Sequence, residues 1–152
     1  ISDAVLEFLV ASGEIILITT PEPTSITDSY SLLKALSRHP RYPVETTAIK
    51  MIAKRDSKEE EGQILYNKLN AVVSRYLKIP FVFLGSVPQD DKLQQAVMQQ
   101  TPVSLQNPYA KASIAYENIA GKLMDKEAIS IKQKRGMAAF FSHIISGRKS
   151  GE

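Results

Sequence analysis

Three short segments with apolar runs predict the strands of this chain. They cover residues 15–19, 44–53 and 81–87, and in the second the apolar part is Ile49, Met51 and Ile52. The first, Ile15-Ile16-Leu17-Ile18, has no polar alternation, which predicts a strand buried on both faces. Between the runs, apolar residues recur every three or four positions, the spacing of an amphipathic helix.

The periodic stretches predict five helices. They lie at residues 2–11, after a capping box formed by Ser25 and Asp28, at 65–76, after a cap at Asp90 or Asp91, and at 112–123. Residues 101–109, with prolines near both ends, predict a loop.

Strands that alternate with helices predict an α/β fold with a doubly wound parallel sheet, because parallel neighbours need long crossovers. Three such strands alone leave two long exposed edges, a recognised liability. The chain also begins at Ile1, without an initiator Met. We therefore expect part of the sheet to lie outside this sequence.

Composition removes several kinds of chemistry. The 152 residues include no Cys and two isolated His, which leaves no pattern for a disulfide scaffold, a zinc site or a Ser–His–Asp triad. No apolar run reaches the roughly 18 residues of a membrane-spanning helix. The two Gly-rich phosphate-binding motifs, G-x-x-x-x-G-K-[ST] and G-x-G-x-x-G, do not occur in the sequence. We find no catalytic and no metal-binding residues in this chain.

One polar segment carries a specific resemblance. Thr19–Tyr30 reads T-T-P-E-P-T-S-I-T-D-S-Y. It resembles the T-T-P-E-P-T-[AS]-I-T-D-[AS]-Y segment of flagellar-number regulator ATPases, the MinD/ParA-class proteins called FlhG, FleN or YlxH. The E-G…K-L…R-Y-L pattern of 61–77, G-S-V-P-Q-D at 85–90 and A-V-M-Q-Q-T-P at 96–102 are similar to the same family. Together they cover about residues 1–124.

The resemblance implies that this chain is the C-terminal half of a P-loop ATPase domain with a deviant Walker A loop upstream. The complete protein would use ATP and Mg²⁺ and dimerise when ATP-bound. This chain alone lacks the Walker A loop, so we expect no cofactor and no appreciable ATP binding or hydrolysis from it.

Two groups of site residues are also implied by the resemblance. The adenine side of the nucleotide corresponds to Lys50 and Met51, where the family has a strand-end Asn, and to Pro88, Gln89 and Asp90. A loop near the dimer interface corresponds to Pro21, Glu22, Pro23 and Thr24. The alternatives are that Asp90 is a helix cap, alone or as well as a ligand contact, and that residues 19–28 form only a Pro-rich turn and a helix cap.

The last residues differ from the rest in charge and pattern. After a basic polar linker at 125–135, residues 136–147 place large apolar side chains at helical spacing, before a short tail at 148–152: Met137, Phe140, Phe141, Ile144 and Ile145. A basic amphipathic helix of this kind favours an anionic membrane surface. It also resembles the membrane-targeting tail of MinD-type proteins. The alternative is a helix that packs on the protein's own core or on a partner.

The resemblance implies a cytoplasmic ATPase, peripherally bound to the inner face of the cell membrane, that regulates flagellar number or placement. Its partners would be a second copy, flagellar basal-body proteins and a flagellar GTPase. A division-site or chromosome-partition ATPase of the same class, or a non-enzymatic membrane adaptor, stays open. No specific nucleic acid is expected, because tracking phosphates needs charge rather than an apolar stripe.

Overall fold

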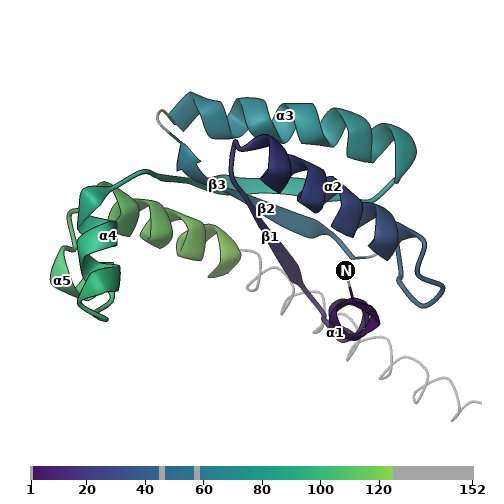
Figure 1. Ribbon diagram of the computed structural model, residues 1–152, viewed down its shortest axis with the longest axis horizontal. Coiled ribbons are helices and arrows are strands. Elements are labelled where there is room, and N and C mark those ends of the chain that lie inside the picture. Colours follow the sequence, from purple (N-terminus) through teal and green to yellow (C-terminus); the bar gives the residue numbers. More distant parts are fainter. Residues whose placement is uncertain (1, 45–46, 57–58, 125–152) are drawn as a thin grey trace, which may run out of the picture. The chain divides into compact units, whose positions relative to one another are not determined.

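The computed structural model describes residues 2–44, 47–56 and 59–124 (Figure 1). They fall into two compact units, one ending at Glu117 and the other beginning at Asn118. The elements of the first unit are α1 (Asp3–Ala11), β1 (Ile15–Thr19), α2 (Pro23–Ser37), β2 (Ile49–Asp56), α3 (Glu59–Tyr76), β3 (Phe81–Pro88), α4 (Asp91–Met98) and α5 (Val103–Gln106). Residues 111–124 are helical. The predicted tail lies outside the described residues.

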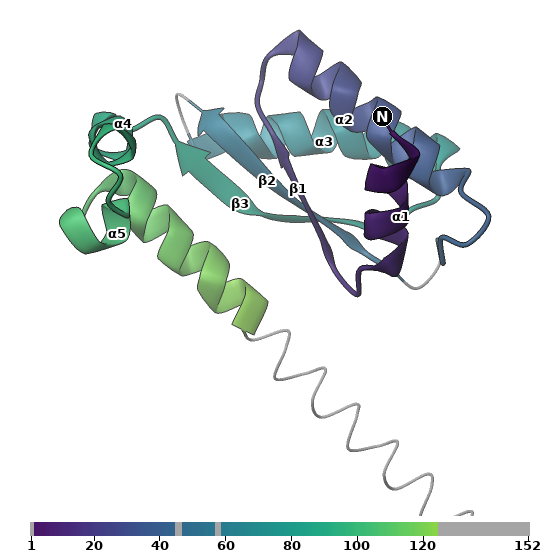
Figure 2. The ribbon, with the colours of Figure 1, turned by 60° about the horizontal axis from the view of Figure 1, so that its bottom comes forward.

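The three strands form one parallel sheet in the order β1-β2-β3. Ile15 pairs with Ile49, which pairs with Phe81, so the strands start level. The crossover helices α2 and α3 lie on the same face of the sheet (Figures 1 and 2). The predicted parallel α/β arrangement is confirmed, whereas helices on both faces of the sheet remain a prediction.

Alternate strand residues point toward α2 and α3, on what we call the covered face, and build the main core. Leu17 and Met51 from the strands meet Leu33, Leu36 and Leu65 from the helices, and all five are buried. Tyr66 of α3 stacks on Phe81 at 5.5 Å between ring centroids, and its hydroxyl donates a 2.9 Å hydrogen bond to the Phe81 carbonyl oxygen. Burial of these side chains stabilises the sheet on this face.

The opposite, open face of β1 corrects the sequence prediction for this strand. Burial along Ile15–Thr19 alternates, and Ile16 and Ile18 are 45% and 58% exposed. The run was expected to be buried on both faces. In the described part of the chain, β1 is an edge strand with a helix on one face only, so its apolar run fills one core and leaves the other half in solvent.

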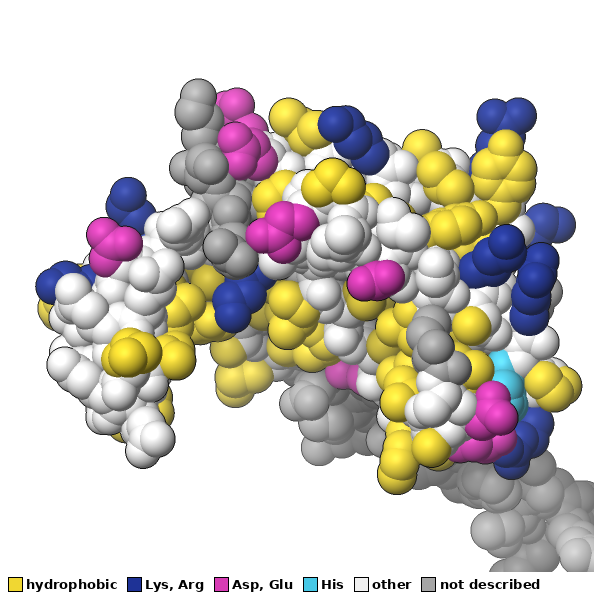
Figure 3. Space-filling model, in the orientation of Figure 1, with side chains coloured by type: hydrophobic (Ala, Val, Ile, Leu, Met, Phe, Trp, Pro, Cys, Tyr) yellow, Lys and Arg dark blue, Asp and Glu magenta, His cyan; other side chains and the backbone are white. Residues whose placement is uncertain are grey.

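Figure 3 shows hydrophobic side chains over β1 and α1 on the viewed face. Val5 and Phe8 of α1 are also large apolar residues in contact with solvent, at 47% and 77% exposure. α1 contributes no buried residue, and only partly buried ones, such as Leu9 and Val10, pack against the core.

Several element ends differ from the sequence prediction. α2 begins at Pro23 with Glu22 as its N-cap residue, so Ser25 lies inside the helix and is not the cap. Proline suits this first position, because its fixed φ is helical and its missing N–H has no helical acceptor. β2 begins at Ile49 and continues to Asp56, and the short helix α5 lies within the segment predicted as a loop.

Candidate functional site

The carboxyl ends of all three strands lie at one edge of the sheet, because the strands are parallel (Figure 2). Ligands of parallel α/β sheets bind at this edge. It receives Thr19 from β1 and Pro88 from β3, and Lys54 of β2 pairs with Val87. The predicted loops 19–24 and 87–91 are therefore at the same edge.

The loop between β1 and α2 is held by its own side chains. The Thr20 N–H donates to Ser25 Oγ at 3.0 Å, and the Thr20 hydroxyl donates to Glu22 Oε2 at 2.6 Å. Below the loop, the hydroxyls of Thr19 and Ser29 share a buried 2.8 Å hydrogen bond that ties the end of β1 to α2. The four residues of the predicted dimer loop are all exposed at the start of α2: Pro21, Glu22, Pro23 and Thr24.

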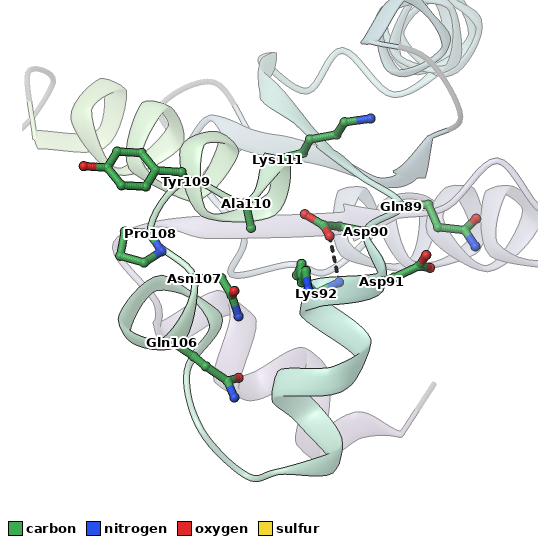
Figure 4. A pocket seen from close by; sticks show the side chains of 10 residues that line it. All are labelled: Gln89, Asp90, Asp91, Lys92, Gln106, Asn107, Pro108, Tyr109, Ala110 and Lys111. Atoms are coloured by element: carbon green, nitrogen blue, oxygen red, sulfur yellow. Dashed lines mark hydrogen bonds between the residues drawn. The ribbon is translucent and has the colours of Figure 1, made fainter.

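The loop after β3 is fixed by Asp90. Its Oδ1 accepts a 2.8 Å hydrogen bond from the Lys92 N–H (Figure 4). Of the two caps that the sequence left open, Asp90 and Asp91, Asp90 is therefore the N-cap of α4. Its Oδ2 accepts a 2.9 Å hydrogen bond from the N–H of Ala112, at the start of the helical residues 111–124. One carboxylate therefore satisfies free backbone donors of two helices.

These donors favour the ionised form of Asp90. The hydrogen bond from Ala112 lowers the pKa of Asp90 below its usual value, and the N–H groups of Lys92 and Leu93 and the charge of Lys111 act in the same direction. Partial burial opposes the shift. Asp90 is therefore a carboxylate at neutral pH.

Two pockets are lined in part by Asp90. One, of about 440 Å³, is lined by Lys54, Pro88, Gln89, Asp90, Leu93, Gln94, Val97 and Met98. We call it the β3 groove. The other, of about 740 Å³, lies between residues 89–92 and 106–111 (Figure 4). The β3 groove combines apolar walls with amide and ammonium groups, the mixture typical of small-molecule sites.

Lys50 and Met51 do not lie at this edge. β2 runs on to Asp56, so Lys50 is four residues from Lys54, or about 13 Å along a strand. Their expected position at a strand end is therefore wrong. Met51 is fully buried in the core, and Lys50 is only 5% exposed, with its Nζ bonded to Glu14 Oε1. Of the predicted adenine-side residues, Pro88, Gln89 and Asp90 line the β3 groove. Lys50 and Met51 do not.

The described residues supply little for metal or membrane chemistry. Within 2–44, 47–56 and 59–124, no three His, Asp or Glu side chains gather as a cation site. In the same part of the chain, no helix is long and apolar enough to cross a membrane. The predicted membrane residues, 137–145, lie outside it.

Among the contacts that sequence reasoning missed, two involve predicted site residues, Lys50 and Asp90. The ion pair between Lys50 and Glu14 joins residues 36 positions apart. A Lys inside an apolar strand was a signal that a partner was needed, because a buried ammonium is costly alone. The hydrogen bond from Ala112 to Asp90 could not be predicted from the local sequence, because the sequence already explains Asp90 as the cap of α4.

Comparison with known proteins finds two relatives. The chain is 35% identical over 123 residues to the antiactivator FleN of Pseudomonas aeruginosa, which covers 81% of this chain and 42% of FleN. It is 27% identical over 142 residues to the flagellum site-determining protein YlxH of Helicobacter pylori, which covers 91% of this chain and 46% of YlxH. The chain thus spans less than half the length of either relative. No family model matches it.

Proposed function

Because this chain belongs to the flagellar-regulator type of the MinD/ParA class, represented by FleN and YlxH, we propose that it is part of an ATPase that controls the number or placement of flagella. The similarity to both relatives over most of the chain carries this proposal. Their names refer to antiactivation and to the choice of flagellar site. The division-site and chromosome-partition alternatives have no such support.

We propose that the β3 groove holds the adenine of ATP. Pro88 and Leu93 offer apolar surface, while Gln89 and Lys54 can meet the ring nitrogens. The size of the groove fits a base within the range of small-molecule pockets. Lys50 and Met51 have no contact role in this proposal, because Lys50 lies about 13 Å from Lys54 along β2 and neither residue lines the groove.

The phosphates and Mg²⁺ find no matching residues in the described chain. No Gly-rich cradle occurs in the sequence, and the described residues hold no cluster of carboxylates for a cation. ATP hydrolysis would therefore need residues that this chain does not supply. When bound, ATP and Mg²⁺ would supply the transferable phosphoryl group and its charge neutralisation.

The exposed loop of residues 21–24 is the proposed contact with a second copy. Its internal hydrogen bonds hold it in one shape before any partner arrives. A preformed loop lowers the entropy cost of association. The tail at 136–147 is the proposed membrane contact, and basal-body proteins and a flagellar GTPase are the proposed further partners.

The cell that carries this chain offers the test of function. Deleting its gene should change the number or position of flagella, counted by electron microscopy, and re-expression should restore them. Unchanged flagella would contradict the proposal. Misplaced septa or lost chromosomes with normal flagella would favour the alternatives.

Purified protein tests the chemistry. Titration calorimetry of this chain with ATP and Mg²⁺ should show neither micromolar binding nor turnover. Phe141→Glu, in the centre of the tail's apolar stripe, should abolish sedimentation with anionic vesicles and leave the melting temperature unchanged. A variant that sediments like the parent contradicts the membrane role, and one that melts much earlier assigns the helix to the core.

A further inference from the structure

Asp90 connects segments that are distant in the sequence. Lys92 lies in the first turn of α4, and Ala112 lies 22 residues from Asp90, where the helical residues 111–124 begin. The first N–H groups of any helix lack an acceptor within that helix and form its positive end. A carboxylate between two such ends is stabilised by both and holds them together.

We propose that Asp90 is a positioning residue that fixes the loop formed by Pro88 and Gln89, and that it does not itself contact the adenine. The inference rests on the proposed function, which assigns that loop to the nucleotide. Each carboxylate oxygen of Asp90 already accepts from a backbone N–H. Gln89, immediately before it, is exposed and free to face the groove.

The neighbouring groups explain why Asp90 rather than Asp91 has this role. Asp91 carries the same charge in the first turn of α4, but neither the Lys92 nor the Ala112 amide donates to it. The hydrogen bond from Ala112 is the main cause of the lowered pKa of Asp90, and the nearby charge of Lys111 acts in the same direction. Asp91→Asn is therefore a matched control that removes one charge and leaves both hydrogen bonds.

An acid titration followed by nuclear magnetic resonance tests the link directly. In the parent chain and in Asp91→Asn, the amide signals of Lys92 and Ala112 should move together, with one apparent pKa below the ordinary Asp value of about 3.9. Asp90→Ser keeps a cap for α4 but is too short to reach Ala112. In this variant hydrogen exchange at Ala112 should quicken at least about tenfold while Lys92 changes little, as expected for the loss of one charge-assisted bond. Separate titration of the two amides would overturn the link.

Adenosine, added at millimolar concentration, tests the positioning role. It should shift the Gln89 amide in the parent, and Asp90→Ser should weaken that binding about fivefold or more, because the loop must then be ordered on binding. Asp91→Asn should bind like the parent. If Asp90→Ser also binds like the parent while Ala112 exchanges fast, Asp90 holds the helices but does not position the loop. If adenosine leaves Gln89 of the parent unmoved, the adenine assignment fails while the titration still decides the link.

Discussion

The two faces of the sheet carry similar apolar side chains but bury them to different extents. On the covered face, Leu17 and Met51 are buried under α2 and α3, whereas on the open face Ile16 and Ile18 of the same short strand are about half exposed. Hydrophobicity alone therefore did not decide burial in β1. What decided it was the position of the two crossover helices, which both lie on one face of the sheet.

The open face is not uniform, because Lys50 lies on it and is nearly inaccessible. Ile16 pairs with Lys50 across the sheet, and Glu14, just before β1, provides the counter-charge. The same face thus contains exposed apolar side chains on β1 and a buried charged one on β2. Its apolar residues on β1 should tolerate change, while its ion pair should not.

The covered face should give the largest loss. Met51→Ala removes a completely buried side chain and should lower the free energy of unfolding by about 2–5 kcal/mol. Urea denaturation followed by circular dichroism measures it. A loss below about 1 kcal/mol would mean that the core collapses into the space and that the two faces differ less than described.

The ion pair on the open face should come next. Glu14→Gln leaves the buried Lys50 ammonium without its partner and should cost about 1–2 kcal/mol, between the values for exposed and for fully buried pairs, because Glu14 is half exposed to solvent. Lys50→Met keeps the length and removes the charge, so it should cost less than Glu14→Gln. The same denaturation curves compare them, and the reverse order would show that Lys50 does not need its partner.

The buried hydroxyl pair on the covered face should have a smaller effect. Thr19→Val keeps the shape of the side chain but leaves the Ser29 hydroxyl unpaired, which should cost about 1 kcal/mol. Adding Ser29→Ala removes the stranded group, so the double variant should lose less than the sum of the single ones. Additive losses in this cycle would mean that the two hydroxyls do not depend on each other.

The exposed isoleucines should show the smallest effect. Ile18→Thr keeps a β-branched side chain in the strand and should change the unfolding free energy by less than about 0.5 kcal/mol. Ile16→Thr serves as its replicate. A loss comparable to that of Met51→Ala would show that β1 is covered on this face in solution.

The sequence predicted the elements better than their surroundings. Apolar runs bounded by Gly13 and by Pro21 or Pro88 predicted β1 and β3 almost to the residue, because those breakers act locally. The start of β2 was predicted too early, at residue 44. The described residues between α2 and β2 are not part of a strand. There the Tyr42 hydroxyl donates a 3.1 Å hydrogen bond to the Thr47 carbonyl oxygen.

The candidate site was predictable only in part. The motif around Pro88 and Asp90 was found, and α4 begins where the Asp predicts. The position of Lys50 was predicted wrongly. A strand ends where its neighbour stops pairing with it, and β3 pairs with β2 as far as Asp56. The Asp90 bond to Ala112 depends on tertiary packing, which no local pattern encodes.

The order of the strands bears on how the chain assembles. β1, β2 and β3 are neighbours in space in the order of synthesis, so each pairing closes a single helical crossover. Proteins whose contacts are closer in sequence fold faster, because less chain entropy is lost before each contact forms. The segment from Ile15 to Pro88 can therefore build its sheet one strand at a time as it leaves the ribosome. The apolar side chains on the open face of β1 are exposed from the first step.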